Sequence, residues 1–136
     1  LQLLLQEMEV DLQVATTDRC QQWALSLSET LQQAVKVTQS LGKSLMEGDP
    51  DKTLANASCY LHLFGHIMVA WMWLRQANAA SHALGSANTD DERNFYQGKL
   101  QAAQYFFHWE LPTVAQDLVL LRNQDDTCLN MKSEWF

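Results

Sequence analysis

The sequence predicts an all-α fold, an antiparallel up-and-down bundle of about four long helices. The 136 residues include only two prolines and five glycines, so few positions favour tight turns. Residues that favour helices, such as Ala, Leu, Gln and Glu, are frequent, and runs of β-branched residues are absent. Apolar residues also recur at steps of three and four, the spacing of one helix face. A chain of this length suits one core, so residues 1–136 are predicted to form a single helical-bundle domain.

The first helix is predicted over residues 2–15, because apolar residues share one of its faces: Leu1, Leu5, Met8, Leu12 and Ala15. Thr16, Thr17 and Asp18 carry side chains that suit an N-cap. Whether these residues break the helix or only kink it is left open by the pattern. A second stripe follows and runs to residues 48–50: Trp23, Leu27, Leu31, Ala34, Thr38, Leu41 and Leu45.

The sharpest turn is predicted at Gly48, Asp49 and Pro50, because glycine suits the residue after a helix end and proline the first helical position. A long helix is predicted to run from there over residues 50–84. It contains the most apolar stretch of the chain, which no polar side chain interrupts from Ile67 to Leu74. A helix that is hydrophobic all round must be covered on every side, so this helix is predicted to be central.

The third long helix is predicted to begin after Thr89 or Asp90, with acidic residues in its first turn. Its apolar stripe is the most regular of the chain: Tyr96, Leu100, Ala103, Phe107, Leu111, Val114, Leu118 and Leu121. Pro112 removes one backbone donor inside this stripe, so a kink is predicted near residues 107–111. After Asn123 the pattern fades, and Trp135 and Phe136 are predicted to dock on the bundle.

Gly65 and Gly98 lie inside predicted helices, where glycine costs up to about 1 kcal/mol relative to alanine. A close approach of two helix backbones would offset that cost and is predicted here, with tolerated drift as the alternative.

Cys59, His62 and His66 share a helix face, and sulfur with imidazole is zinc-like ligation. No second cluster of ligands accompanies them, so they are predicted to be core or partner-facing groups and no metal site is assigned. The Glu-x-x-His pairs of a di-iron bundle are absent.

The stretch from His82 to Ala87 resembles the phosphorylatable histidine of histidine phosphotransfer domains, but it lacks the lysine that this family has between Leu and Gly. An ordinary histidine near a helix end is the alternative. The chain has no glycine-rich phosphate loop and no G-x-S-x-G motif. No catalytic and no cofactor-binding residue is therefore assigned.

Charge and cysteine usage exclude some partners and environments. Nine basic and sixteen acidic residues give a formal net charge of −7, which disfavours nucleic acid. Three well-separated cysteines suit a reducing compartment, so the cytoplasm is predicted. The most apolar window contains His62 and His66 and is shorter than the roughly 20 residues that span a bilayer, so no transmembrane segment is predicted. The chain opens without an initiator methionine, and we expect it to be a C-terminal fragment of a longer protein.

Trp71, Trp73, Phe106 and Trp109 are more aromatic surface than one small bundle readily hides. They are the predicted interface residues, either in a homodimer or against the rest of a longer protein.

Two stretches, YLHLFGHIMVAWMWLR at residues 60–75 and FYQGKLQAAQYFFHWELP at residues 95–112, carry a family resemblance. They resemble the extra C-terminal domain of a subgroup of bacterial acyl-CoA dehydrogenases that includes the 3-methylmercaptopropionyl-CoA dehydrogenase type. Gln104 departs from that pattern, where the family prefers a basic residue.

The resemblance implies a parent flavoenzyme, in which FAD accepts a hydride from the β-carbon of an acyl-CoA while a glutamate removes the α-proton. It implies that the flavin and glutamate motifs lie upstream, because nothing in this chain matches them, and that this domain serves packing and subunit contacts. The competing hypothesis is a free-standing helical interaction or histidine phosphotransfer module, complete in itself.

Overall fold

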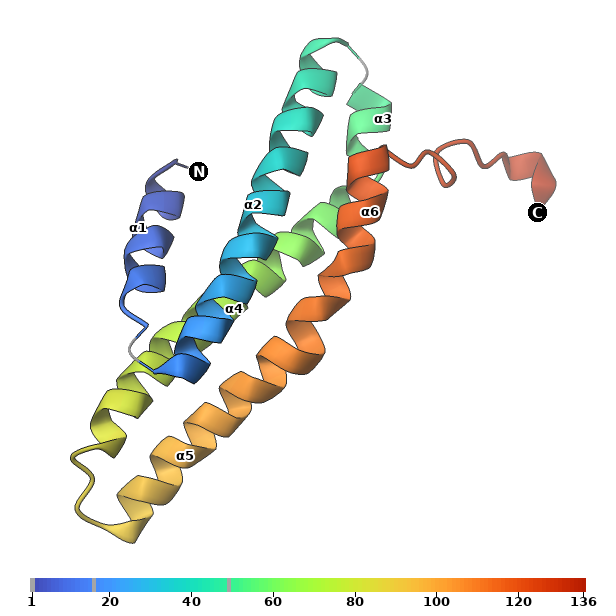
Figure 1. The fold of residues 1–136 in the computed structure, drawn as a ribbon. Helices are drawn as coiled ribbons and strands as arrows, with labels where there is room; N and C mark the ends of the chain where they lie inside the picture. The colour runs from blue at the N-terminus through green and yellow to red at the C-terminus, as the bar shows by residue number, and fades with distance from the viewer. Residues whose placement is uncertain (1, 16, 49) are drawn as a thin grey trace.

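The computed structural model describes residues 2–15, 17–48 and 50–136, and over these residues the fold is all-helical with no strand, as predicted. Its α-helices are α1 Gln2–Gln13, α2 Asp18–Met46, α3 Pro50–Leu54, α4 Ala57–Leu84, α5 Asp90–Tyr105 and α6 Ala115–Asn123. Figure 1 shows α2, α4 and the α5–α6 arm as long rods with α1 beside α2. Leu1, Thr16 and Asp49, used above for a stripe, a cap and a turn, lie outside the described residues.

Residues before position 48 form two helices, which answers the question that the pattern left open. Thr17 is the N-cap of α2, and its hydroxyl accepts a hydrogen bond from the Cys20 backbone N–H at 3.3 Å. The predicted turn is confirmed at Gly48, whose φ of +93° lies in the left-handed region that glycine adopts without strain.

The prediction of one helix over residues 50–84 is wrong, because α3 ends at Leu54 and α4 begins at Ala57. Asn56 lies at the break and donates from Nδ2 to the carbonyl oxygen of Asp125 at 2.6 Å. The backbone of Asn56 is not helical, with φ −113° and ψ 33°, and its side-chain bond ties this break to the residues after α6.

The predicted kink before Pro112 is confirmed as a change of helix type. Phe106–Glu110 is a π-helix and Leu111–Val114 a 3-10 helix, and the Leu111 N–H donates to the Phe106 carbonyl. Pro112 has no backbone N–H to donate, and the change from α-helix to π-helix and then to 3-10 helix accommodates that absence. The core stripe is retained on both sides of it, because seven of its members are buried: Leu100, Ala103, Phe107, Leu111, Val114, Leu118 and Leu121.

The core is formed where α4 contacts α2, α5 and α6. Trp23 of α2 stacks on Phe107 with ring centroids 5.5 Å apart. Helix α1 adds the fully buried Met8 and reaches α4 through Asp11, whose Oδ2 accepts a hydrogen bond from Trp71 Nε1 at 2.7 Å.

Helix α4 has most of these contacts, yet the prediction that it is covered on every side is wrong. Only 28% of its most apolar 18-residue window is buried inside the chain. The small bundle covers one side of α4 and leaves the other to solvent. By length and composition α4 could cross a membrane, a test that core helices of soluble proteins also pass, and the absence of a transmembrane segment stays a prediction.

The C-terminal tail does not dock on its own bundle, so that prediction is also wrong. Trp135 and Phe136 are 63% and 96% exposed. Figure 1 shows the segment after α6 extending away from the helices. The Trp135 ring has a local contact instead, with the Lys132 ammonium 5.4 Å from its centroid.

Candidate functional site

The uncovered side of α4 carries a row of apolar residues. Leu61, Gly65, Val69 and Met72 follow one another at steps of four, four and three, and all four are exposed. No Asp, Glu, Lys or Arg occurs between Ala57 and Leu74. We call these four residues the α4 row. An uncharged apolar row of this length on a surface is typical of a contact site.

A second row lies on α5 and continues into the π-helix. Phe95, Gly98, Tyr105 and Trp109 share one face, with the half-buried Ala102 between them, and the three aromatic side chains are 60%, 53% and 71% exposed. Tyr105 and Trp109 stack with centroids 6.2 Å apart and rings inclined by 12°. We call Phe95, Gly98, Tyr105 and Trp109 the α5 row.

Lys99 joins the two helices beside these rows. Its Nζ lies 5.5 Å from the Phe95 ring centroid and 6.0 Å from that of Trp73, and it donates to Gln76 Oε1 at 3.4 Å. The rows therefore flank one seam between neighbouring helices, and together they offer a broad apolar surface.

The four predicted interface residues are not gathered at one place. Trp71 is buried under α1 and is an internal contact, which corrects its assignment to a surface. Trp73 and Phe106 are half-buried, Trp73 at the seam and Phe106 beside His66, with centroids 6.0 Å apart. Trp109 is the exposed member and belongs to the α5 row.

The other members of the rows were not identified from the sequence. Their signal was present, because the apolar residues of α4 occupy the side opposite the buried stripe as well as the stripe itself. A separate count of apolar residues on each side of each helix identifies them.

The prediction that Gly65 and Gly98 mark a close approach of helices is wrong within this chain. A Cβ atom at either position would meet no atom within 4 Å. Each glycine instead lies in the middle of one exposed row.

His62 is exposed on α4 and His66 is half-buried. Of the two predicted roles, a core position is wrong for His62, and a partner-facing role stays a prediction. His62 Nδ1 lies 2.6 Å from Asp117 Oδ2 of α6, and the two histidine rings are 4.1 Å apart. Within the described part of the chain, no group of three or more His, Cys, Asp or Glu residues could hold a metal ion.

Two ionisable groups near these surfaces have perturbed pKa values. Burial, and then a hydrogen bond to Asp117, raises the pKa of the Cys59 thiol, so this thiol is a poor nucleophile. The pKa of Tyr105 is raised because its hydroxyl donates to Glu110 Oε1 at 2.8 Å and because that carboxylate is negative. Both shifts oppose formation of an anion.

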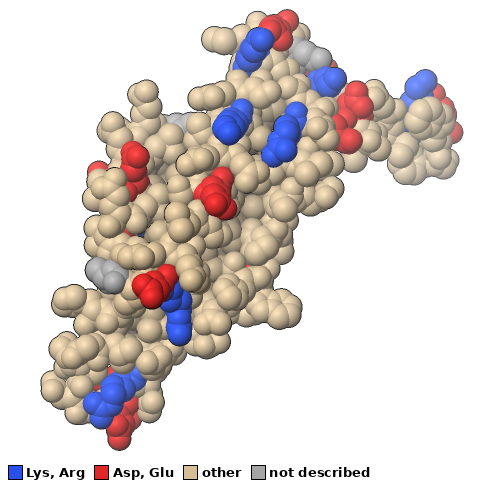
Figure 2. Space-filling view, in the orientation of Figure 1, with Lys and Arg blue, Asp and Glu red and all other residues tan. Residues whose placement is uncertain are grey.

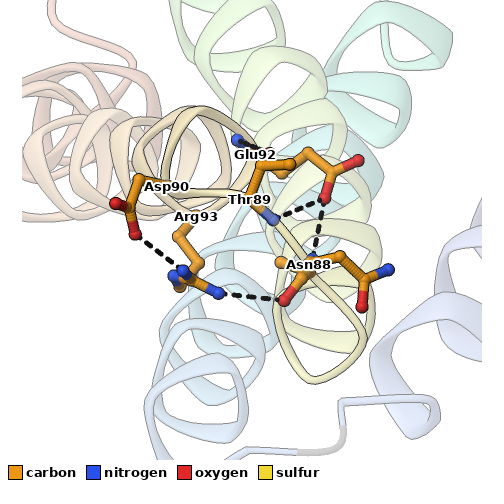
Figure 3. A network of polar contacts seen from close by, with 6 residues as sticks. Asn88, Thr89, Asp90, Glu92 and Arg93 are labelled. Atoms are coloured by element: carbon orange, nitrogen blue, oxygen red, sulfur yellow. Dashed lines mark hydrogen bonds and ion pairs between the residues drawn. The ribbon is translucent and has the colours of Figure 1, made fainter.

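The N-terminus of α5 is closed by its own side chains. Glu92 Oε2 accepts from the backbone N–H groups of Asn88 and Thr89 at 2.8 and 3.2 Å, and the Thr89 hydroxyl accepts from the Glu92 backbone N–H at 3.2 Å (Figure 3). These backbone bonds hold the pKa of Glu92 below its usual value. Acidic side chains thus occupy the place where a flavin diphosphate could bind a helix end, so these residues do not fit that group.

The charged groups form no continuous basic surface on the face shown in Figure 2, where Lys and Arg are scattered among acidic and uncharged residues. His82 is exposed in the last turn of α4, near Gly85. That position matches an ordinary helix-end histidine rather than the mid-helix histidine of a phosphotransfer domain.

Comparison with known proteins gives two matches. The profile of the family described as "Acetyl-CoA dehydrogenase C-terminal like" matches residues 4–132. A 77-residue stretch is 30% identical to the broad-specificity linear acyl-CoA dehydrogenase FadE5 of Mycobacterium tuberculosis. That stretch is 57% of this chain but 13% of the relative, so the match spans only a small part of the relative's length.

Proposed function

Because this chain belongs to the family of acetyl-CoA dehydrogenase C-terminal-like domains, we propose that it is the C-terminal accessory domain of an FAD-dependent acyl-CoA dehydrogenase. In the reaction of the parent dehydrogenase, FAD accepts the hydride from the β-carbon of the acyl-CoA. This chain contributes packing, since its α4 row and α5 row contact other domains or subunits of the parent enzyme.

The uncovered side of α4 is the observation that carries this proposal. Leu61, Val69 and Met72 are 75%, 44% and 37% exposed on the most apolar helix of the chain. At about 25 cal/mol per Å² of apolar surface, covering even about 400 Å² contributes roughly 10 kcal/mol to association. Such a surface favours a permanent partner over solvent.

Chemistry is assigned to the rest of the parent. The side chains at the α5 N-terminus would repel a diphosphate, and the Cys59 and Tyr105 shifts favour inert neutral groups. These observations support a chain that neither binds flavin nor turns over acyl-CoA by itself.

Three finer features belong to the same proposal. The parent is placed in the 3-methylmercaptopropionyl-CoA dehydrogenase-like subgroup on the motif at residues 60–75. It is a cytoplasmic enzyme, in keeping with the three free cysteines. It is also a homodimer, and the exposed rows form part of the contact between its subunits. Nucleic acid is not among its partners.

A matched pair of substitutions tests the packing role. Val69→Glu lies in the α4 row and Val119→Glu on α6, and the two valines are 44% and 46% exposed in the chain alone. In the 136-residue chain both variants should change the free energy of unfolding by less than about 0.5 kcal/mol. In the full-length parent Val69→Glu buries a charge and should lower stability by more than about 2 kcal/mol, while Val119→Glu stays neutral.

Hydrogen exchange supplies the second measurement. The amides of α4 between Leu61 and Met72 should be better protected in the full-length parent than in the isolated chain. Equal protection in both, together with equal effects of the two valine variants, would rule out a docking role for the α4 row. FAD uptake by the isolated chain would contradict the assignment of chemistry to the rest of the parent.

A further inference from the structure

A cavity of about 250 Å³ lies between α2, α3, α4 and α6, and its lining includes no residue of the α4 or α5 rows. Leu121 of α6 forms part of the lining and is 2% exposed. Leu45 and Leu54 also line it and are 48% and 59% exposed, so they mark its mouth. The cavity therefore leads from an apolar rim to the core.

The polar side chains of the lining are already paired within the protein. Thr38 Oγ1 donates to the Ala34 carbonyl at 2.8 Å, so its contact of 2.9 Å with Tyr60 is donated by the tyrosine hydroxyl. Thr53 Oγ1 donates to Ser44 Oγ at 2.9 Å.

The remaining polar side chain of the lining, Asn56, donates to the Asp125 carbonyl. Among the residues that the structure describes, no Asp, Glu, Lys, Arg or His lines the cavity. The lining thus presents carbon, and its occupant must be apolar.

Size and shape narrow the class of occupant. An engineered apolar cavity of about 150 Å³ takes up benzene, which has six carbon atoms. At the same volume per carbon atom, this cavity of about 250 Å³ has room for about ten. Its α2 wall extends from Thr38 to Leu45, two helical turns or about 10 Å along the axis. An extended alkyl chain suits such a shape better than a flat ring does.

Gly42 keeps part of this wall open. It lies inside α2, where glycine costs about 1 kcal/mol relative to alanine, and it lines the cavity. A Cβ atom there would meet nothing within 4 Å. Any larger side chain at Gly42 would extend over space that the cavity now offers.

We propose that this cavity is a binding site for an unbranched alkyl chain of about eight to ten carbons, such as the chain of a medium-length fatty acid or alcohol. The site is separate from the proposed packing surface and is present in the 136-residue chain by itself. It requires no charged headgroup, because the described part of the lining offers no charge to recognise one.

The test is calorimetric titration of the 136-residue chain with 1-hexanol, 1-octanol, 1-decanol and 1-dodecanol, each below its solubility limit. Neutral alcohols exclude attraction to surface charges. One molecule should bind per chain, and affinity should rise about fourfold per added methylene up to about ten carbons and then level off, because the volume is filled.

Two variants locate the binding. Gly42→Leu should weaken decanol binding at least tenfold, because its side chain occupies the cavity. Lys43→Leu is the matched control, since Lys43 is the next residue of the same helix, is exposed, and does not line the cavity. It should bind decanol as the unmodified chain does, and circular dichroism should show both variants helical. If Gly42→Leu is unfolded, Ala57→Leu, on the opposite wall, replaces it as the blocking variant.

Three results would overturn the proposal. The first is no saturable binding of any alcohol. The second is an affinity that keeps rising beyond twelve carbons or is unchanged in the blocking variants, since either would place the alcohol on an exposed surface. The third is a dimer that Gly42→Leu converts to a monomer, because the cavity would then hold a side chain of a second copy. None of these results bears on packing by the α4 row.

Discussion

Replacing Gly65 and Gly98 by alanine should stabilise the isolated chain. Each glycine lies inside a helix, and a Cβ atom at either position meets nothing within 4 Å, so no steric term opposes the gain in helix propensity. That gain is about 0.8 to 1 kcal/mol per site. Lys99, next to Gly98, contacts Gln76, which is about 16 Å along α4 from Gly65, so the two gains should add to nearly 2 kcal/mol.

The assay is urea unfolding followed by circular dichroism, supported by thermal unfolding. At this chain length, 1 kcal/mol corresponds to roughly 3 to 5 °C in Tm, so the double variant should gain several degrees. Gly48→Ala is the control of opposite sign, because its φ of +93° strains any residue with a Cβ atom, and it should lower stability by about 1 kcal/mol.

A loss of stability in Gly65→Ala or Gly98→Ala would refute the reasoning, since it would require a neighbour that this fold does not provide. The full-length parent gives the contrasting result. If other domains pack on the two rows, the same substitutions there should gain less or become unfavourable, because a partner backbone then lies where the Cβ atom points.

Three further predictions concern single interactions. Trp71→Phe removes the hydrogen bond to Asp11 and should cost about 1.5 to 3 kcal/mol, with faster proteolysis between α1 and α2 as the measured sign that α1 is released. Glu92 has a lowered pKa, so its stabilisation is present above its unfolded value of 4.5 and is lost as pH falls through the folded value; the Tm difference between Glu92→Gln and the unmodified chain should shrink from pH 6 to pH 3. Glu110→Gln should lower the raised pKa of Tyr105 toward about 10 in an ultraviolet titration, because the carboxylate that opposes ionisation is gone.

The sequence predicted what depends on local pattern. The stripe from Leu100 to Leu121 was read at the correct phase through Pro112, because apolar spacing reports the buried side even where the helix changes type. The cap at Thr89 and the turn at Gly48 follow from residue types with narrow conformational preferences. These features are decided by residues at most a few positions apart.

Features that depend on distant residues were missed. The break before α4 contains Asn56, whose side chain bonds to Asp125, 69 positions away in the sequence. The exposure of Val69 and the burial of Trp71 depend on where α1 and α5 lie around α4, and nothing in the apolar run distinguishes its two sides. The bundle is too small to cover the run, and that limit appears only once the helices are assembled.

The π-helix at Phe106–Glu110 also restricts how the length of this chain can vary. Each residue of an α-helix turns the chain by about 100°, and the buried stripe keeps its phase through this segment, so deleting one residue from it would rotate everything after it by about that angle. Leu118 and Leu121 would then face away from the core, and Asp125, whose carbonyl accepts from Asn56, would be turned with them. Related chains should therefore keep the spacing between Phe107 and Leu118, while the loop between α4 and α5 is free to lengthen.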